Sequence, residues 1–63
     1  MDLSSMKEIL KAAIEAEKDS IVFYLGMQDV VPEKLGKGRI QAIIKEEMGH
    51  IKILSGKLVS LKK

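Results

Sequence analysis

The apolar residues of this chain recur at steps of three and four along two long segments. Such steps place side chains on one face of an α-helix, so each segment is predicted to be an amphipathic helix. The first segment contains Met6, Ile9, Leu10, Ala13, Ile14, Glu17, Ile21, Tyr24, Leu25 and Gln28. The second contains Ile40, Ile43, Ile44, Glu47, His50, Ile51, Leu54, Leu58 and Leu61. Carboxylates therefore interrupt both apolar stripes, and an imidazole interrupts the second.

One short break separates the two segments. Pro32 biases Val31 away from the helical conformation, and Gly36 and Gly38 follow within six residues. The break is predicted to contain a short helical turn over residues 32–35, with Leu35 packed back against the helices. A break of this length is a turn within one domain rather than a linker between two.

The predicted boundaries follow from this break and from a capping signal near the N-terminus. Ser5 and Glu8 fit a capping box, with Ser5 as the N-cap. Residues 1–63 are therefore predicted to form a single domain. It consists of a first helix over about 5–29, a loop over about 30–37 and a second helix over about 38–61.

Two helices joined by a short loop predict an all-α fold, an antiparallel helical hairpin. Both helices carry apolar residues beside the main stripes, which a two-helix contact cannot cover. These are Val22, Phe23, Leu25, Met48, Ile53 and Val59. We therefore expect two hairpins to associate through a two-fold axis into a four-helix bundle, a homodimer or a higher even-numbered oligomer.

Composition narrows the means by which so short a chain can be stable. The 63 residues include no cysteine, which excludes disulfides and thiolate metal sites. A metal, a partner chain or both are left. The net charge of +2 comes from mixed charges, and the longest apolar stretch, residues 21–27, is too short for a bilayer. We expect no nucleic-acid partner, no membrane insertion and a cytoplasmic location.

Three side chains could meet at mid-height of the hairpin. Glu17 lies about thirteen residues before the loop, and Glu47 lies about ten residues after it, one helical turn from His50. A dimer would then supply four carboxylates and two imidazoles, which is the ligand set of di-metal carboxylate bundles. Clustered carboxylates repel unless cations neutralise them. This mixed oxygen and nitrogen set suits iron, with two ions per dimer, or manganese or zinc.

Two motifs carry a family resemblance. Glu17-Lys18-Asp19-Ser20-Ile21-Val22-Phe23-Tyr24 resembles the first-helix motif of ferritin-like and rubrerythrin-like proteins, a ligand glutamate followed seven residues later by tyrosine. Glu46-Glu47-Met48-Gly49-His50 resembles their second-helix Glu-x-x-His motif. The resemblance covers roughly residues 9–58 and implies a ferritin-like four-helix bundle.

The resemblance also implies roles for five residues. It makes Glu17, Glu47 and His50 the metal ligands, with no catalytic residue apart from them. Tyr24 would hydrogen-bond a ligand carboxylate or simply pack in the core. Glu46 would support the ligands or pair with a lysine on the surface. The implied chemistry is that of a di-iron oxidoreductase using O2 or peroxide, a ferroxidase or peroxide reductase in iron handling or oxidative defence.

This chain departs from the family in length and composition. Typical members carry four helices and both motif pairs in one chain, whereas this one carries a single pair, as in two-helix encapsulated ferritins. It also lacks the cysteines of a rubredoxin module, which leaves the electron donor open. Two alternatives stay open: a metal-free dimerisation hairpin, and one half of a longer ferritin-like chain.

Overall fold

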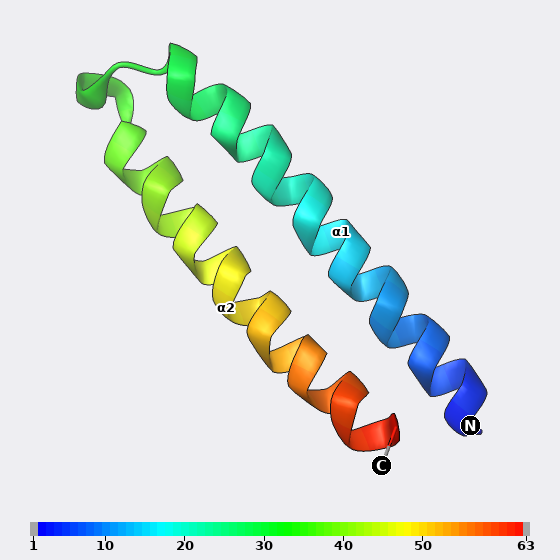
Figure 1. Ribbon diagram of the computed structural model, residues 1–63. Helices are drawn as coiled ribbons and strands as arrows, with labels where there is room; N and C mark the ends of the chain where they lie inside the picture. Colours follow the sequence, from blue (N-terminus) through cyan, green and yellow to red (C-terminus); the bar gives the residue numbers. More distant parts are fainter. Residues whose placement is uncertain (1, 63) are drawn as a thin grey trace.

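The chain is an antiparallel helical hairpin (Figure 1). The computed structural model describes residues 2–62. It consists of α1 (Leu3–Val30), a 3-10 helix η1 (Glu33–Leu35) and α2 (Lys37–Lys62), with no strand among the described residues. The long axis measures 47 Å, and the two shorter axes measure 14 Å each. The predicted all-α hairpin is confirmed, and both helices extend one or two residues beyond the predicted bounds.

Asp2 caps the N-terminus of α1. Its Oδ1 accepts a hydrogen bond from the Ser5 backbone N–H at 2.8 Å, and its carbonyl accepts one from the Met6 N–H at 3.1 Å. The predicted capping box was therefore wrong, because Ser5 and Glu8 lie inside the helix. A carboxylate is a stronger acceptor than a hydroxyl and also favours the positive end of the helix dipole. These two effects begin the helix earlier, at Leu3.

The turn between the helices is tight and fully hydrogen-bonded at its exit. Val31, which precedes the proline, is extended as predicted, and η1 provides the predicted helical turn. Gly36 ends η1 with a φ of 113°, a left-handed conformation that disfavours other residues. Its carbonyl then accepts from Ile40 at 3.1 Å and thus begins α2. Leu35 is 78% exposed, so the prediction that it packs against the helices was wrong: η1 directs it outward.

The two helices meet along one line of side chains, which we call the seam. Every residue of the seam is buried or partly buried. On α1 these are Leu10, Ile14, Glu17, Ile21, Tyr24 and Gln28; on α2 they are Ile40, Ile44, Glu47, Ile51, Leu54, Leu58 and Leu61. Three residues of the predicted stripe of α1, Met6, Ile9 and Leu25, are instead exposed, because they lie beside the line of contact. Among the described hydrophobic residues, Ile14, Ile40 and Ile44 are the most buried, at 7–9% exposed. A single seam thus gives this chain a thin core.

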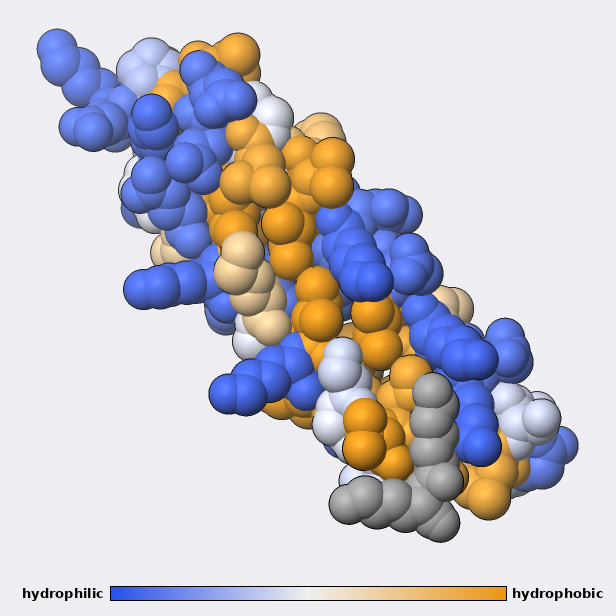
Figure 2. Space-filling view, viewed as in Figure 1, coloured by the Kyte–Doolittle hydropathy of each residue, from blue (hydrophilic) through white to orange (hydrophobic). Residues whose placement is uncertain are grey.

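Much apolar surface stays uncovered. The six side chains predicted to exceed the needs of one hairpin are all at least 47% exposed. Figure 2 shows an apolar band running along the molecule between hydrophilic margins. The accessible surface is 4887 Å², whereas a compact monomer of 7.0 kDa exposes about 4,000 Å². None of the helices in the described residues combines the length and hydropathy needed to cross a bilayer.

Candidate metal site

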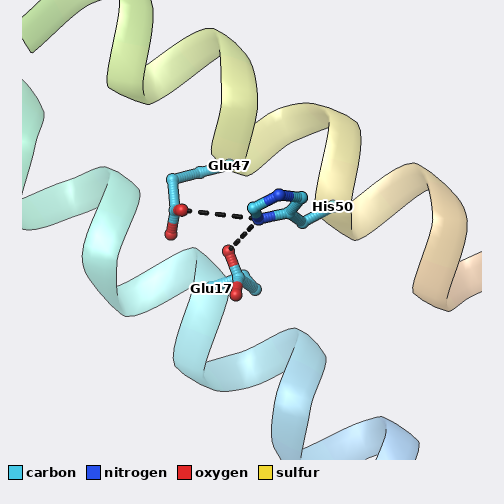
Figure 3. Close-up of side chains that lie close together, drawn as sticks. All are labelled: Glu17, Glu47 and His50. Atoms are coloured by element: carbon cyan, nitrogen blue, oxygen red, sulfur yellow. Dashed lines mark ion pairs between the residues drawn. The ribbon is translucent and has the colours of Figure 1, made fainter.

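Glu17 of α1 meets Glu47 and His50 of α2 at the middle of the hairpin (Figure 3). The imidazole Nδ1 of His50 lies 3.5 Å from Glu17 Oε2 and 3.5 Å from Glu47 Oε1. One ligand atom from each of the three residues lies within 4.8 Å of the others. The structure thus brings together the three residues that the sequence nominates, on two helices and across the seam.

The two carboxylates and the imidazole differ in exposure. The side chains of Glu47 and Glu17 are 17% and 25% exposed, whereas that of His50 is 51% exposed. The prediction that His50 occupies the apolar line was therefore wrong. At about 100° per residue, three steps from Glu47 turn His50 roughly 60° aside, and Ile51 takes the place in the seam. The imidazole consequently opens onto one face of the hairpin.

The surroundings of Glu47 perturb its carboxyl group. The pKa of Glu47 is raised above its ordinary value of 4.5, first because its side chain hydrogen-bonds with that of Glu17. Desolvation and the negative charges of Glu17 and Glu46 raise it further, and His50 opposes them. A raised pKa is the usual result when two acidic groups share one desolvated site. A bound cation would oppose this shift and favour the ionised form of Glu47.

One buried oxygen atom of the site has an ion-pair contact but no hydrogen bond. Glu17 Oε2 is buried and has no hydrogen-bond partner in the part of the chain that the structure describes. Its distance of 3.5 Å from His50 Nδ1 is long for a hydrogen bond. Buried carboxylate oxygens in such surroundings are normally paired or bound to a cation. The donor set of two carboxylates and one imidazole fits iron, manganese or zinc.

The two supporting residues of the prediction take different places. Glu46 is exposed and lies outside the three-residue cluster, but its charge contributes to the raised pKa of Glu47. Tyr24 is partly buried in the seam and packs edge-to-face on Phe23, with 5.4 Å between ring centroids. Within residues 2–62 its hydroxyl makes no hydrogen bond to a ligand carboxylate. Its packing is that of a core residue.

Sequence reasoning overlooked a second feature, an apolar cleft at the open end of the hairpin. Six residues line its volume of about 520 Å³: Met6, Ile9, Leu10, Lys57, Ser60 and Leu61. The signal was present in the sequence, because Ile9 and Leu10 are adjacent and cannot both face the same helix. Because Ile9 of α1 and Ser60 of α2 line the same cleft, these two residues lie on the same face of the hairpin.

Comparisons of this chain with protein-family models, with curated proteins and with solved structures return no match. The ferritin-like resemblance therefore rests on its two sequence motifs. What the structure adds is the convergence of Glu17, Glu47 and His50 from two helices. The binding of a metal and the chemistry that follows from it are accordingly proposals.

Proposed function

We propose that this hairpin binds divalent metal through Glu17, Glu47 and His50, and that two copies together hold a di-metal site. Iron is the metal that the resemblance implies, with two ions per dimer. The function would be that of a ferroxidase or peroxide-reducing protein, with O2 or peroxide as the small-molecule substrate. The observation that carries the proposal is the buried Oε2 of Glu17, which has no hydrogen-bond partner within residues 2–62 and lies in a cluster of two carboxylates and one imidazole.

Charge explains why one hairpin supplies only half of such a site. A single cluster offers three ligand groups, two of them carboxylates and one an imidazole. Doubling it across a two-fold axis gives the four carboxylates and two imidazoles that two divalent ions need. Four carboxylates could not all ionise in so small a volume without those cations. Metal binding and dimerisation are therefore coupled in this proposal.

The side chains have distinct parts in binding. Glu17 presents an oxygen without a hydrogen-bond partner in the described residues, whereas Glu47, whose pKa is raised by Glu17 and by desolvation, would bind the metal in its ionised form. His50 presents Nδ1 toward both carboxylates and is exposed enough to turn toward a neighbouring chain. Bound iron would supply the redox chemistry that protein side chains lack. The protein contributes the geometry and the partly desolvated surroundings.

The uncovered apolar surface favours a second candidate, a metal-free dimerisation hairpin. Both candidates predict a dimer, but only the first predicts that stability depends on metal. In the second, the Glu17, Glu47 and His50 cluster would be an interfacial group of polar residues. Removing one carboxylate would then be neutral or stabilising with or without metal.

Titration calorimetry and elemental analysis separate the two candidates. Protein purified without chelator should contain about one metal ion per chain, and chelated protein should take up Fe(II) anaerobically, or Mn(II), to the same level. Glu47→Gln keeps the shape of the side chain and should abolish uptake. Glu15→Gln is the matched control, because Glu15 is an exposed carboxylate of α1 outside the cluster. Equal uptake by both variants, or none by the unmodified chain, refutes the proposal.

Oxidation is tested separately from binding. Fe(II) added to the apoprotein should be oxidised by O2 or peroxide faster than in buffer, with the loss of Fe(II) followed by a ferrous chelating dye. The Glu47→Gln variant should match the buffer rate, and Glu15→Gln should match the unmodified protein. Metal uptake without accelerated oxidation would leave a binding protein and exclude the ferroxidase or peroxidase role.

A further inference from the structure

The open-end cleft identifies one face of the hairpin. Leu10 and Leu61 in its lining belong to the seam, whereas Ile9, Lys57 and Ser60 lie on its rim. Each of Ile9 and Ser60 precedes a seam residue by one position, which turns it about 100° away from the seam. Since these residues line one cleft, both displaced positions face the same side of the molecule.

Continuing these positions along the helices defines what we call the His50 face. Starting from Ile9 and from Ser60, alternating steps of four and three residues stay on this side. On α1 the face consists of Ile9, Ala13, Ala16, Ser20, Phe23, Met27 and Val30; on α2 it consists of Arg39, Ile43, Glu46, His50, Ile53, Lys57 and Ser60. Each helix therefore carries two adjacent heptad stripes, one for the seam and one for this face.

The His50 face is largely apolar and uncovered. Ile9, Phe23, Val30 and Ile53 are 53–77% exposed, and the half-exposed His50 opens onto the same side. No lysine or arginine interrupts the α1 part of the face, and charges of both signs occur on the α2 part. Such a surface can meet its own copy without a row of like charges.

The opposite face is less suited to self-association. It also exposes large apolar residues, among them Val22 and Met48, at 69% and 54%. By the same helical geometry, however, Lys18, Lys45 and Lys52 flank them, and all three are exposed. Lys18 is paired with Glu15 at 3.4 Å, but a two-fold axis would bring Lys45 and Lys52 toward their own copies. Repulsion between like charges disfavours that contact.

We propose that the His50 face is covered by a second copy of this chain, related by a two-fold axis perpendicular to the helices. In this arrangement α1 packs antiparallel against α1 of the second copy, and α2 packs against α2. The loop of each hairpin lies at the open end of the other. The inference rests on the two-chain site proposed above, but its face and orientation follow from the apolar pattern and not from the metal.

The position of the site supports this orientation. Glu17 and His50 lie near the middle of their helices, so an axis through the site lets the two hairpins overlap over their full length. The residues of the face then pair by size across the axis. On α1, Ala13 meets Phe23 of the second copy, and Ile9 meets Met27 of the second copy. On α2, Glu46 meets His50 of the second copy, which gives Glu46 a place beside the paired site.

The same register fills the open-end cleft. Ile9 and Met6 of one copy lie at the height of Met27 and Val30 of the other. Val30 is 77% exposed in the single hairpin, and the cleft of about 520 Å³ is apolar apart from Lys57 and Ser60 at its rim. Met27 and Val30 of the second copy are therefore the occupants that this dimer assigns to the cleft.

The surface area agrees with a dimer of ordinary size. The hairpin exposes roughly 850 Å² more than a compact chain of its mass. A stable interface covers about 800 Å² on each partner. One second copy of this chain thus matches the uncovered excess.

Adjacent residues of α1 provide a matched test of the face. Phe23 and Val22 are 63% and 69% exposed in the single hairpin and point to opposite faces. Analytical ultracentrifugation should show that Phe23→Asp lowers dimer affinity by at least 100-fold, whereas Val22→Asp changes it less than threefold. Val30→Asp and Leu35→Asp form a second pair with 77% and 78% exposure, and only the first should weaken the dimer. The reverse order in either pair overturns the choice of face.

One spin label per chain, placed outside the proposed interface, tests the relative orientation of the two hairpins. The chain has no cysteine, so Lys34→Cys in η1 gives one labelled site at the loop end of each hairpin. Pulsed electron paramagnetic resonance should give a distance of roughly 45 Å between the two labels of a dimer, since the loops lie at opposite ends of a bundle with a 47 Å long axis. A distance below about 25 Å, near the width of a four-helix bundle, would place both loops at one end and overturn the inference.

Both experiments are run with chelator and with Mn(II). A long distance together with no metal uptake refutes the proposed function and leaves this inference intact. Metal uptake together with a short distance refutes the inference and leaves the function intact. A protein that stays monomeric in both conditions overturns the inference, whatever the effect of the metal.

Discussion

Replacement of Glu17 by glutamine tests whether the central cluster is a metal site or a group of polar residues. The substitution keeps the size and shape of the side chain and removes one carboxylate charge. The buried Oε2 of Glu17 has no hydrogen-bond partner within residues 2–62, so the substitution breaks no hydrogen bond of that atom. Its effects on metal-dependent stability therefore report the missing ligand.

The expected magnitude follows from linkage between binding and folding. A metal present at 100 times its dissociation constant stabilises the folded state by about 2.7 kcal/mol. For a chain of this size that corresponds to a rise in melting temperature on the order of 10–20 °C. If losing Glu17 weakens binding a hundredfold, the same metal concentration contributes only about 0.4 kcal/mol. Most of the rise should then disappear.

The assay is thermal unfolding followed by circular dichroism at 222 nm, with chelator and with Mn(II). In chelator, Glu17→Gln should be neutral or more stable than the unmodified chain, because one of two adjacent carboxylates is gone. Glu15→Gln is the control: Glu15 is exposed and pairs only with Lys18 at 3.4 Å, so the metal-dependent rise should persist. An unchanged rise in Glu17→Gln would refute the assignment of Glu17 as a ligand.

Three further predictions concern the metal-free chain. In chelator, the free energy of unfolding should fall as pH rises above about 4.5, because the pKa of Glu47 is higher in the folded chain than in the unfolded chain. Urea titrations at several pH values should show this dependence on pH, and Glu47→Gln should weaken it. Ile44→Ala should cost about 2–5 kcal/mol in the same titrations, since Ile44 is 7% exposed, whereas Met48→Ala, at 54%, should change stability by less than about 0.5 kcal/mol. Gly26→Ala should stabilise by up to about 1 kcal/mol, because no atom beyond its own helix lies within 4 Å of an added Cβ; a lower melting temperature would contradict this.

The period of the apolar pattern was enough to predict both helices and most of the seam. Ile14, Ile40 and Ile44 are the most buried hydrophobic residues of the described chain, and all three stand in the predicted stripes, whereas Met6, Ile9 and Leu25 of the same stripes are exposed. The break at Pro32 was also predictable from the sequence, since proline fixes the local backbone and glycine permits conformations that other residues avoid. The capping box was wrong because Asp2 competes for the same helix end, and sequence spacing does not rank two acceptable caps.

The exposure of His50 needed the structure. The sequence showed only that this residue follows the three-four rhythm, which tolerates a rotation of 60° from the seam. The prediction that Leu35 packs against the helices was wrong for a similar reason. An apolar residue in a turn belongs to no periodic pattern that would show where its side chain points. In both cases the direction of one side chain depends on where the second helix lies.

The sequence alone determined the secondary structure, the pairing of two helices and the identity of the three clustered residues, since helical periodicity is a local property. Only the tertiary structure decided that ligand atoms of Glu17, Glu47 and His50 lie within 4.8 Å of one another and that His50 opens onto one face of the hairpin. It also decided which flanks of α1 and α2 form one face, because that depends on the rotation of each helix about its own axis. That rotation is set by contacts between residues far apart in the chain, and it decides which apolar residues stay exposed on each face of the hairpin.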